Sequence, residues 1–162
     1  MKISKVRKVK TPTRGTAKSA GIDFYIPNYE APFMLYPGDD VLIPSGIKAA
    51  IPTGHMLMAA NKSGVSTSRY ACLGAGLAPK DKAFESIVIL GAEIVDEDYQ
   101  GEIFIHLVNV GNHKVMLEPG MKIAQFILVP IAYEDVEEVS EDQLFESDSE
   151  RGSGALGSTG SY

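Results

Sequence analysis

The sequence predicts an all-β fold, and three observations support this prediction. Its apolar runs are short, rich in β-branched residues and bounded by glycine or proline, as strands usually are. The 162 residues include 16 glycines and 9 prolines, spread between these runs, which indicates many turns. A 44% apolar content over this length suits one globular domain with a buried core.

The apolar runs locate the expected strands in chain order. They cover residues 3–9, 19–26, 41–43, 46–51, 55–60, 87–90, 103–110 and 122–129. Polar or proline-rich connections are expected at 11–18 and 28–38, a turn at 116–120, and an irregular surface excursion at 66–86.

The apolar pattern thins near residue 134, where the domain organisation is expected to change. Residues 1–133 are predicted to form the β core, and 134–162 an acidic linker followed by a glycine-rich arm. The second part holds nine acids and one base, which leaves the first part near neutral, with 12 acids and 14 bases. A near-neutral body gives no support for a nucleic-acid-binding face.

Other function classes are excluded by what the sequence lacks. No apolar run reaches the roughly 18 residues of a membrane span, so no membrane partner is expected. The single Cys72 excludes a disulfide framework and a cysteine-based zinc site.

The stretch GAEIVDEDYQGE, residues 91–102, is the strongest candidate for chemistry. Strand alternation places Asp96 on the same face as Ile94, so one carboxylate lies beside an apolar neighbour, and Tyr99 adds a flat ring nearby. A carboxylate in such surroundings is a candidate general base for a water molecule. The alternative is a solvated acidic hairpin with Gly101 as its turn residue.

Three further positions combine polar chemistry with apolar surroundings. Asp23 lies inside an apolar strand, where an acid is costly without a partner, and is either an Asx-type turn or part of a polar or metal-linked site. The tripeptide Lys62, Ser63 and Gly64 supplies the chemistry of an anion cradle or forms a surface turn. Gln125 is either paired internally or available to a ligand.

The glycine-rich C-terminal stretch 151–160 has two readings. Its composition is typical of a disordered terminus. It also suits an arm that wraps around phosphate, because Arg151 supplies a bidentate cation, and glycines and hydroxyls can surround one anion.

Together, in order, SAGIDF, NKSG, GAEIVDEDYQGE, GMKIAQFIL and RGSGALGSTG resemble the five motifs of the trimeric dUTPase family. The resemblance covers nearly the whole chain from Ser19. It implies a jelly-roll-like β-barrel and a homotrimer with a flexible C-terminal arm and active sites at subunit interfaces. It also implies hydrolysis of dUTP to dUMP and pyrophosphate, with Mg²⁺ held by the triphosphate.

The resemblance assigns roles residue by residue. Asp96 matches the residue that activates the attacking water, and Tyr99 the ring beneath the deoxyribose that excludes a 2′-hydroxyl. The backbone from Gly91 to Ile94 matches the hairpin that reads uracil, and Asp23 an acid tied to the water shell of the metal. The positions that match phosphate contacts or the closing arm are Lys62, Ser63, Gly64, Gln125, Arg151, Leu156, Gly157, Ser158 and Thr159.

Three departures from the family pattern stand out. Lys62 replaces the usual arginine, so a point charge replaces a bidentate contact. Leu156 replaces the usual aromatic ring of the arm. The segment between Gly64 and Gly91 is longer than usual, like the insertions of some phage members, and we expect a regulatory protein to bind at 65–86.

Two alternative functions stay open at this point. One is a dCTP deaminase of the same superfamily, and the other is a trimeric regulatory module that binds a partner through the insertion. The expected localisation is the cytoplasm, bacterial or, if the chain is phage-encoded, that of the host.

Overall fold

The computed structural model describes residues 1–28, 32–66, 88–90, 94–111, 114–147, 149–150 and 152–153. The chain divides into two compact units, Met1–Ala132 and Tyr133–Tyr162.

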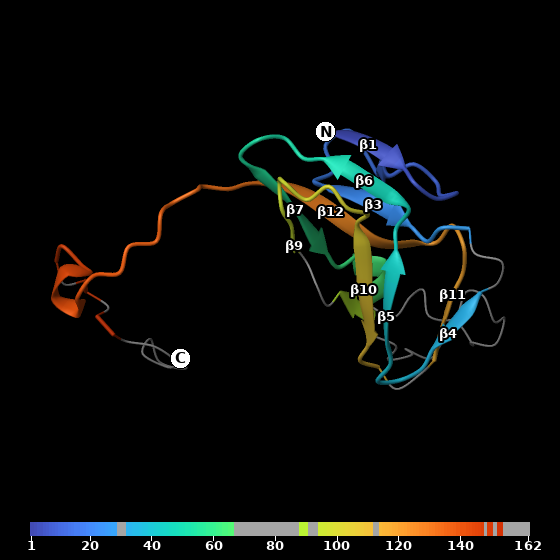
Figure 1. Ribbon diagram of the computed structural model, residues 1–162. Helices are drawn as coiled ribbons and strands as arrows, with labels where there is room; N and C mark the ends of the chain where they lie inside the picture. The colour runs from blue at the N-terminus through green and yellow to red at the C-terminus, as the bar shows by residue number, and fades with distance from the viewer. Residues whose placement is uncertain are drawn as a thin grey trace. The chain divides into compact units, whose positions relative to one another are not determined.

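The first unit contains twelve described strands, which confirms the predicted all-β class (Figure 1). They are β1 (Lys2–Lys5), β2 (Thr13–Arg14), β3 (Gly21–Tyr25), β4 (Phe33–Leu35), β5 (Asp40–Pro44), β6 (Ile47–Ala50), β7 (His55–Ala60), β8 (Val88–Leu90), β9 (Ile94–Val95), β10 (Phe104–Asn109), β11 (Val115–Leu117) and β12 (Lys122–Pro130). The described helices are single turns, α1 (Ser63–Ser66) and the 3₁₀ turn η1 (Glu141–Gln143). Among the described residues, no helix is long and apolar enough to cross a membrane.

All described strand pairings are antiparallel. The largest sheet has the order β2-β3-β12-β7-β9, and a second has the order β5-β10-β8. Two further pairs, β1 with β6 and β4 with β11, complete the ladders. Hydrogen bonding among the described strands therefore gives four open sheets rather than one closed barrel.

The two larger sheets contribute to one shared hydrophobic core. Phe24 of β3 and Phe126 of β12 pack with ring centroids 4.4 Å apart, and Leu57 of β7 is fully buried. From the second sheet, alternation along β10 buries Ile105 and Leu107 while Phe104 stays exposed. This apolar-in pattern is what made β7, β10 and β12 readable from the sequence.

Two strands of three residues each were not predicted. β4 lies inside the expected connection 28–38. β11 includes the first two residues of the expected turn 116–120, so the turn starts later than predicted. It closes where the Met121 N–H donates to the Glu118 carbonyl at 3.2 Å. Three-residue strands are too short to show alternation, and within the described part of the chain these two pair only with each other, in the register Met116 to Met34. The prediction failed here because this pairing is a tertiary contact.

The N-terminal strand is also shorter than predicted. It ends at Lys5 instead of residue 9, because the chain leaves the β1–β6 ladder there, although Val9 is still buried. The two-residue strand β2 lies within the expected loop 11–18 and pairs with β3.

Candidate functional site

A pocket of about 190 Å³ lies beside Asp96. Its lining is mostly apolar, with Asp96 and Tyr99 as the polar members: Ile94, Val95, Asp96, Tyr99, Ile103, Phe104 and Phe126. β9 aligns along β7 with Val95 opposite Leu57, and the chain then turns where the Tyr99 N–H donates to the Asp96 carbonyl at 3.2 Å. The structure thus brings the predicted carboxylate, ring and apolar floor together.

Two acids of the stretch 91–102 accept hydrogen bonds from backbone N–H groups of neighbouring turns. Glu97 accepts a hydrogen bond from the Gly54 N–H at 2.7 Å, and Glu102 accepts one from the Gly46 N–H at 2.7 Å. These two acids therefore anchor the segment to neighbouring turns. Exposure alternates as predicted, with Asp96 exposed and Glu97 half-buried.

The side chain of Asp96 has no hydrogen-bond partner within the described parts of the chain. It lies in an apolar pocket and keeps all its acceptor positions available. A carboxylate so placed can accept a proton from a bound water molecule.

Tyr99 is held in one orientation. Its hydroxyl donates to the Glu102 carbonyl at 2.8 Å, and a Cβ on Gly101 would collide with the phenol ring. Gly101 lies at a bend, in line with its predicted role as a turn residue, and its φ is not positive. Glycine is needed there because the Tyr99 ring occupies the space where a side chain would lie.

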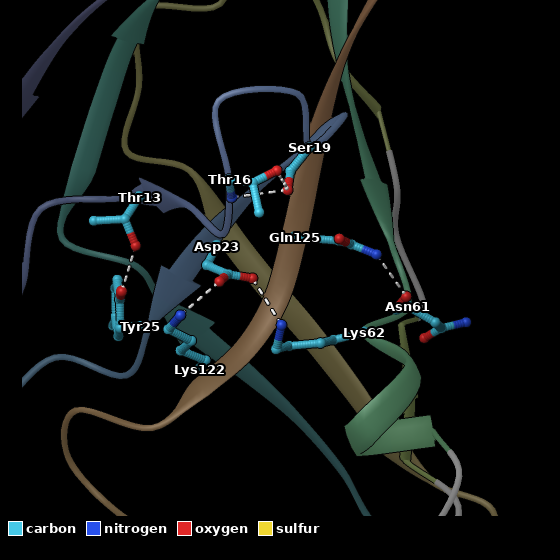
Figure 2. Close-up of polar contacts among 9 residues, drawn as sticks. All are labelled: Thr13, Thr16, Ser19, Asp23, Tyr25, Asn61, Lys62, Lys122 and Gln125. Carbon is cyan, nitrogen blue, oxygen red and sulfur yellow. Dashed lines mark hydrogen bonds and ion pairs between the residues drawn. The ribbon is translucent and has the colours of Figure 1, made fainter.

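Asp23 forms a second polar site, on β3 (Figure 2). It is only 5% exposed, and both of its carboxylate oxygens are occupied: Oδ1 accepts from Lys62 Nζ at 2.9 Å and Oδ2 from Lys122 Nζ at 2.8 Å. The structure thus favours the polar site over an Asx-type turn, because Asp23 lies within a paired strand.

The two lysines determine the ionisation of this site. Burial on its own raises the pKa of Asp23, but the hydrogen bonds and charges of Lys122 and Lys62 outweigh it and hold that pKa below its ordinary value. The hydrogen bond to Asp23 correspondingly raises the pKa of Lys122. Asp23 therefore stays an anion with two cationic partners.

Gln125 is paired internally. It lies opposite both Asp23 and Ala60 in the strand register, and its Nε2 donates to the Asn61 carbonyl at 3.0 Å (Figure 2). A Cβ on Gly21 would collide with its Oε1, so the glycine of the SAGIDF segment makes room for this amide. Lys62 and Gln125 thus meet at the end of β7.

The NKSG segment begins a single helical turn, in which the Val65 N–H donates to the Lys62 carbonyl at 2.8 Å. Ser63 is the first residue of this turn and Gly64 the second. The predicted surface turn is therefore helical, and its lysine points to Asp23.

Within one chain the two polar sites are separate. Val95 pairs with Leu57 near the middle of β7, whereas Lys62 lies two residues beyond the last residue of that strand, Ala60. The lining of the Asp96 pocket does not include Asp23, Lys62 or Lys122. Among the described residues, Asp96 and the Asp23 cluster therefore share neither a pocket nor a hydrogen bond.

The remaining predicted site residues lie outside the described residues. They are Gly91, Arg151, Leu156, Gly157, Ser158 and Thr159, together with most of the insertion at 65–86. Among the described residues, no group of three or more histidines, cysteines, aspartates or glutamates could hold a metal ion.

Sequence reasoning missed three residues that build these sites. Lys122 lies in the GMKIAQFIL segment. The signal that could have identified it was Asp23, because a buried acid needs cationic partners. Arg7 and Glu102 form an ion pair at 2.7 Å, and no local pattern connects residues so far apart in the sequence.

Comparisons with known proteins bear on what these sites do. The dUTPase family model matches residues 7–160. The chain is 34% identical to the deoxyuridine 5′-triphosphate nucleotidohydrolase of Mus musculus over 149 residues, which cover 92% of this chain and 77% of the mouse protein.

Solved structures of phage dUTPases share the fold. That of Staphylococcus bacteriophage 80alpha with dUpNHpp has a TM-score of 0.78 and 22% identity, and covers 98% of this chain and 97% of its own. A mutant dUTPase from phage phi11 of S. aureus, described as revealing the coordination of a structural Mg(II) ion, has a TM-score of 0.68 and 17% identity, over 86% and 96% of the two chains.

Proposed function

Because this chain belongs to the dUTPase family, we propose that it hydrolyses dUTP to dUMP and pyrophosphate, with Asp96 activating the attacking water. The observation that carries the proposal is the Asp96 carboxylate, which has no hydrogen-bond partner among the described residues and lies in an apolar pocket that it shares with Tyr99. Asp96 accepts a proton from the water, the water oxygen bonds to the α-phosphorus, and the bond to the departing pyrophosphate breaks. A positioned base of this kind contributes about 10²–10⁴-fold.

Tyr99 and the uracil-reading backbone determine which nucleoside enters. The Tyr99 ring, fixed by its hydrogen bond to the Glu102 carbonyl, lies at the pocket and crowds a 2′-hydroxyl. The segment from Gly91 to Ile94 reads the uracil edge in this proposal.

The phosphates are bound by the lysine-rich site. Lys62, Ser63, Gly64 and Gln125 lie together at the end of β7, and Lys122 adds a second positive charge. Charge neutralisation and positioning are the main needs of phosphoryl transfer, and this cluster supplies both. The arm residues Arg151, Leu156, Gly157, Ser158 and Thr159 close over the nucleotide and exclude water.

Two copies of the chain must contribute to one active site. Asp96 and Lys62 share no pocket or hydrogen bond among the described residues, and in this proposal a nucleotide contacts both groups. A homotrimer with the site between neighbours supplies Asp96 from one protomer and the lysine cluster from another.

Mg²⁺ enters as part of the substrate, on the triphosphate. The described residues do not fit a resident metal, because they contain no ligand cluster and both Asp23 oxygens are bonded to lysines. In this proposal Asp23 therefore contacts the Mg²⁺ ion only through the water shell of the metal. The ion supplies charge neutralisation of the triphosphate.

Pyrophosphate release from dUTP, dTTP, dCTP and UTP, each with Mg²⁺, tests the proposal. We expect release from dUTP alone at a substantial rate. Ammonia release from dCTP would instead support the deaminase. A protein that is monomeric and inert toward dUTP would contradict both the hydrolysis and the shared site.

A regulatory partner of the insertion is a second proposal. We infer that residues 65–86 bind another protein. The segment exceeds the family pattern in length, and phage dUTPases, among them that of Staphylococcus bacteriophage 80alpha, control transfer of virulence genes. A pulldown with the full chain and with a chain that lacks the insertion 65–86 tests this. Equal capture by both forms would contradict it.

A further inference from the structure

The segment that carries Asp96 and Tyr99 is tied to the N-terminal part of the chain through Glu102. Arg7 Nε donates to Glu102 Oε1 at 2.7 Å, and Arg7 Nη2 donates to Oε2 at 3.1 Å. A paired guanidinium and carboxylate fix each other in direction as well as in distance. The Glu102 side chain is only 14% exposed.

A third donor completes this arrangement. The Gly46 N–H also bonds to Glu102 Oε1, at 2.7 Å, and the Gly46 carbonyl accepts from the Val6 N–H at 2.8 Å. Arg7 and Gly46 therefore approach Glu102 as one connected unit. The Arg7 guanidinium and the Gly46 N–H both hold the pKa of Glu102 below its ordinary value, against the opposing effect of burial.

The backbone of the same residue holds the aromatic ring. The Tyr99 hydroxyl donates to the Glu102 carbonyl at 2.8 Å, and the ring covers Gly101. The orientation of the ring thus depends on the position of the Glu102 backbone, and that position depends on the carboxylate. Neither Arg7 nor Glu102 lines the pocket of Asp96, so any effect on substrate is indirect.

We infer that the Arg7–Glu102 ion pair is a positioning device that sets the Tyr99 ring and thereby the discrimination between deoxyribose and ribose nucleotides. The inference rests on the proposed function, in which Tyr99 contacts the sugar. Losing the pair frees Glu102 to shift, and a shift of the ring opens space for a 2′-hydroxyl. Arg7 and Glu102 are positioning residues, because they act through Tyr99.

The test compares Arg7→Met with Lys8→Met in the full chain. The first removes the guanidinium and keeps an aliphatic stem, and the second removes one positive charge from the adjacent exposed position. We expect Arg7→Met to lower kcat/KM for dUTP about tenfold while UTP changes little, because a small misplacement far from the chemistry is costly. Lys8→Met should keep the wild-type ratio of dUTP to UTP.

A second variant covers the case in which Arg7→Met fails to fold. Glu102→Gln keeps the size of the side chain and an acceptor for the Gly46 N–H, but loses the paired contact with Arg7. It should also reduce the dUTP preference. An unchanged ratio in a folded Glu102→Gln protein would overturn the inference and leave the proposed hydrolysis intact.

A binding measurement separates this inference from the proposed function. The affinities of dUMP and UMP, measured by calorimetry, need no turnover. A wild-type protein that binds dUMP more tightly than UMP yet does not hydrolyse dUTP would overturn the hydrolysis. In that case the two proteins are compared by their preference for dUMP over UMP. A weaker preference in Arg7→Met than in the wild type supports the positioning role, and the same preference in both overturns it.

Discussion

Two aspartates, one on the five-stranded sheet and one directly after its edge strand β9, lie in opposite surroundings. Asp96, after β9, is exposed in a small apolar pocket and has no hydrogen-bond partner among the described residues. Asp23, on β3, is buried and has a lysine on each carboxylate oxygen. Asp96 keeps its acceptor positions accessible to a ligand, whereas both carboxylate oxygens of Asp23 accept hydrogen bonds from lysines. The same type of side chain is thus accessible to a ligand in one region and fully bonded in the other.

The largest expected effect comes from removing the carboxylate of the exposed region. Asp96→Asn should lower kcat for dUTP by about 10²–10⁴-fold, because the amide cannot accept the proton from water. Nucleotide binding should persist, and Tm should stay within about 2 °C because the side chain is exposed and unpaired. Steady-state pyrophosphate release and thermal melting measure the two effects. Undiminished hydrolysis would contradict the role of Asp96.

The matched change in the buried region should act first on stability. Asp23→Asn keeps the shape of the side chain but removes the charge that two lysines share, so the free energy of unfolding should fall by about 2 kcal/mol. Urea denaturation of both aspartate variants measures the contrast. Equal stability of Asp23→Asn and the wild type would show that the lysines find other partners.

A third change sharpens the comparison at the pocket wall. Gly101→Ala places a methyl group where the Tyr99 ring lies, while the backbone there tolerates alanine. We expect kcat/KM for dUTP to fall about tenfold as the ring moves. Gly15→Ala is the matched control, since its Cβ would meet only Ser19 Oγ, at an ordinary 3.4 Å. Similar kinetics for both alanine variants would contradict the packing role of Gly101.

The smallest expected effect is the pH dependence of the stability that the Asp23–lysine cluster contributes. The pKa of Asp23 in the folded chain is below 3.8, so its contribution to stability is complete above that value and is lost as pH falls through the folded pKa. The stability difference between wild type and Asp23→Asn should therefore shrink below about pH 4. The pKa of Lys122 is raised, so the opposite pH dependence applies to it. Its stabilisation is complete below pH 10.5 and is lost as the pH rises through the pKa of Lys122 in the folded chain. Urea unfolding of the wild type and Asp23→Asn from acid to alkaline pH measures both effects. A stability difference that does not change with pH would contradict them.

Much of the fold was predictable because periodicity is local. β7 begins and ends at the predicted residues, His55 and Ala60, and β12 extends one residue past its prediction. Both are long enough to show a buried and a less buried face. β4 and β11 were missed because three residues carry no such pattern.

The candidate site was predictable in part for the same reason. Alternation placed Asp96 beside Ile94, and the pocket contains both. The role of Gly101 was not predictable, because the ring that covers it comes from the folded conformation of Tyr99. Nor was it predictable that Glu97 and Glu102 anchor their segment, since Gly54 and Gly46 are distant in the sequence.

By itself the sequence determined the all-β class, the central strands and the presence of a carboxylate and a ring beside apolar residues. These follow from interactions between near neighbours, which composition and spacing record. Tertiary structure alone decided which acids stay available. Asp23 receives its lysines from 39 and 99 residues along the chain, and whether an acid gains a cation depends on which strands pair, a long-range choice made by burial of the shared core.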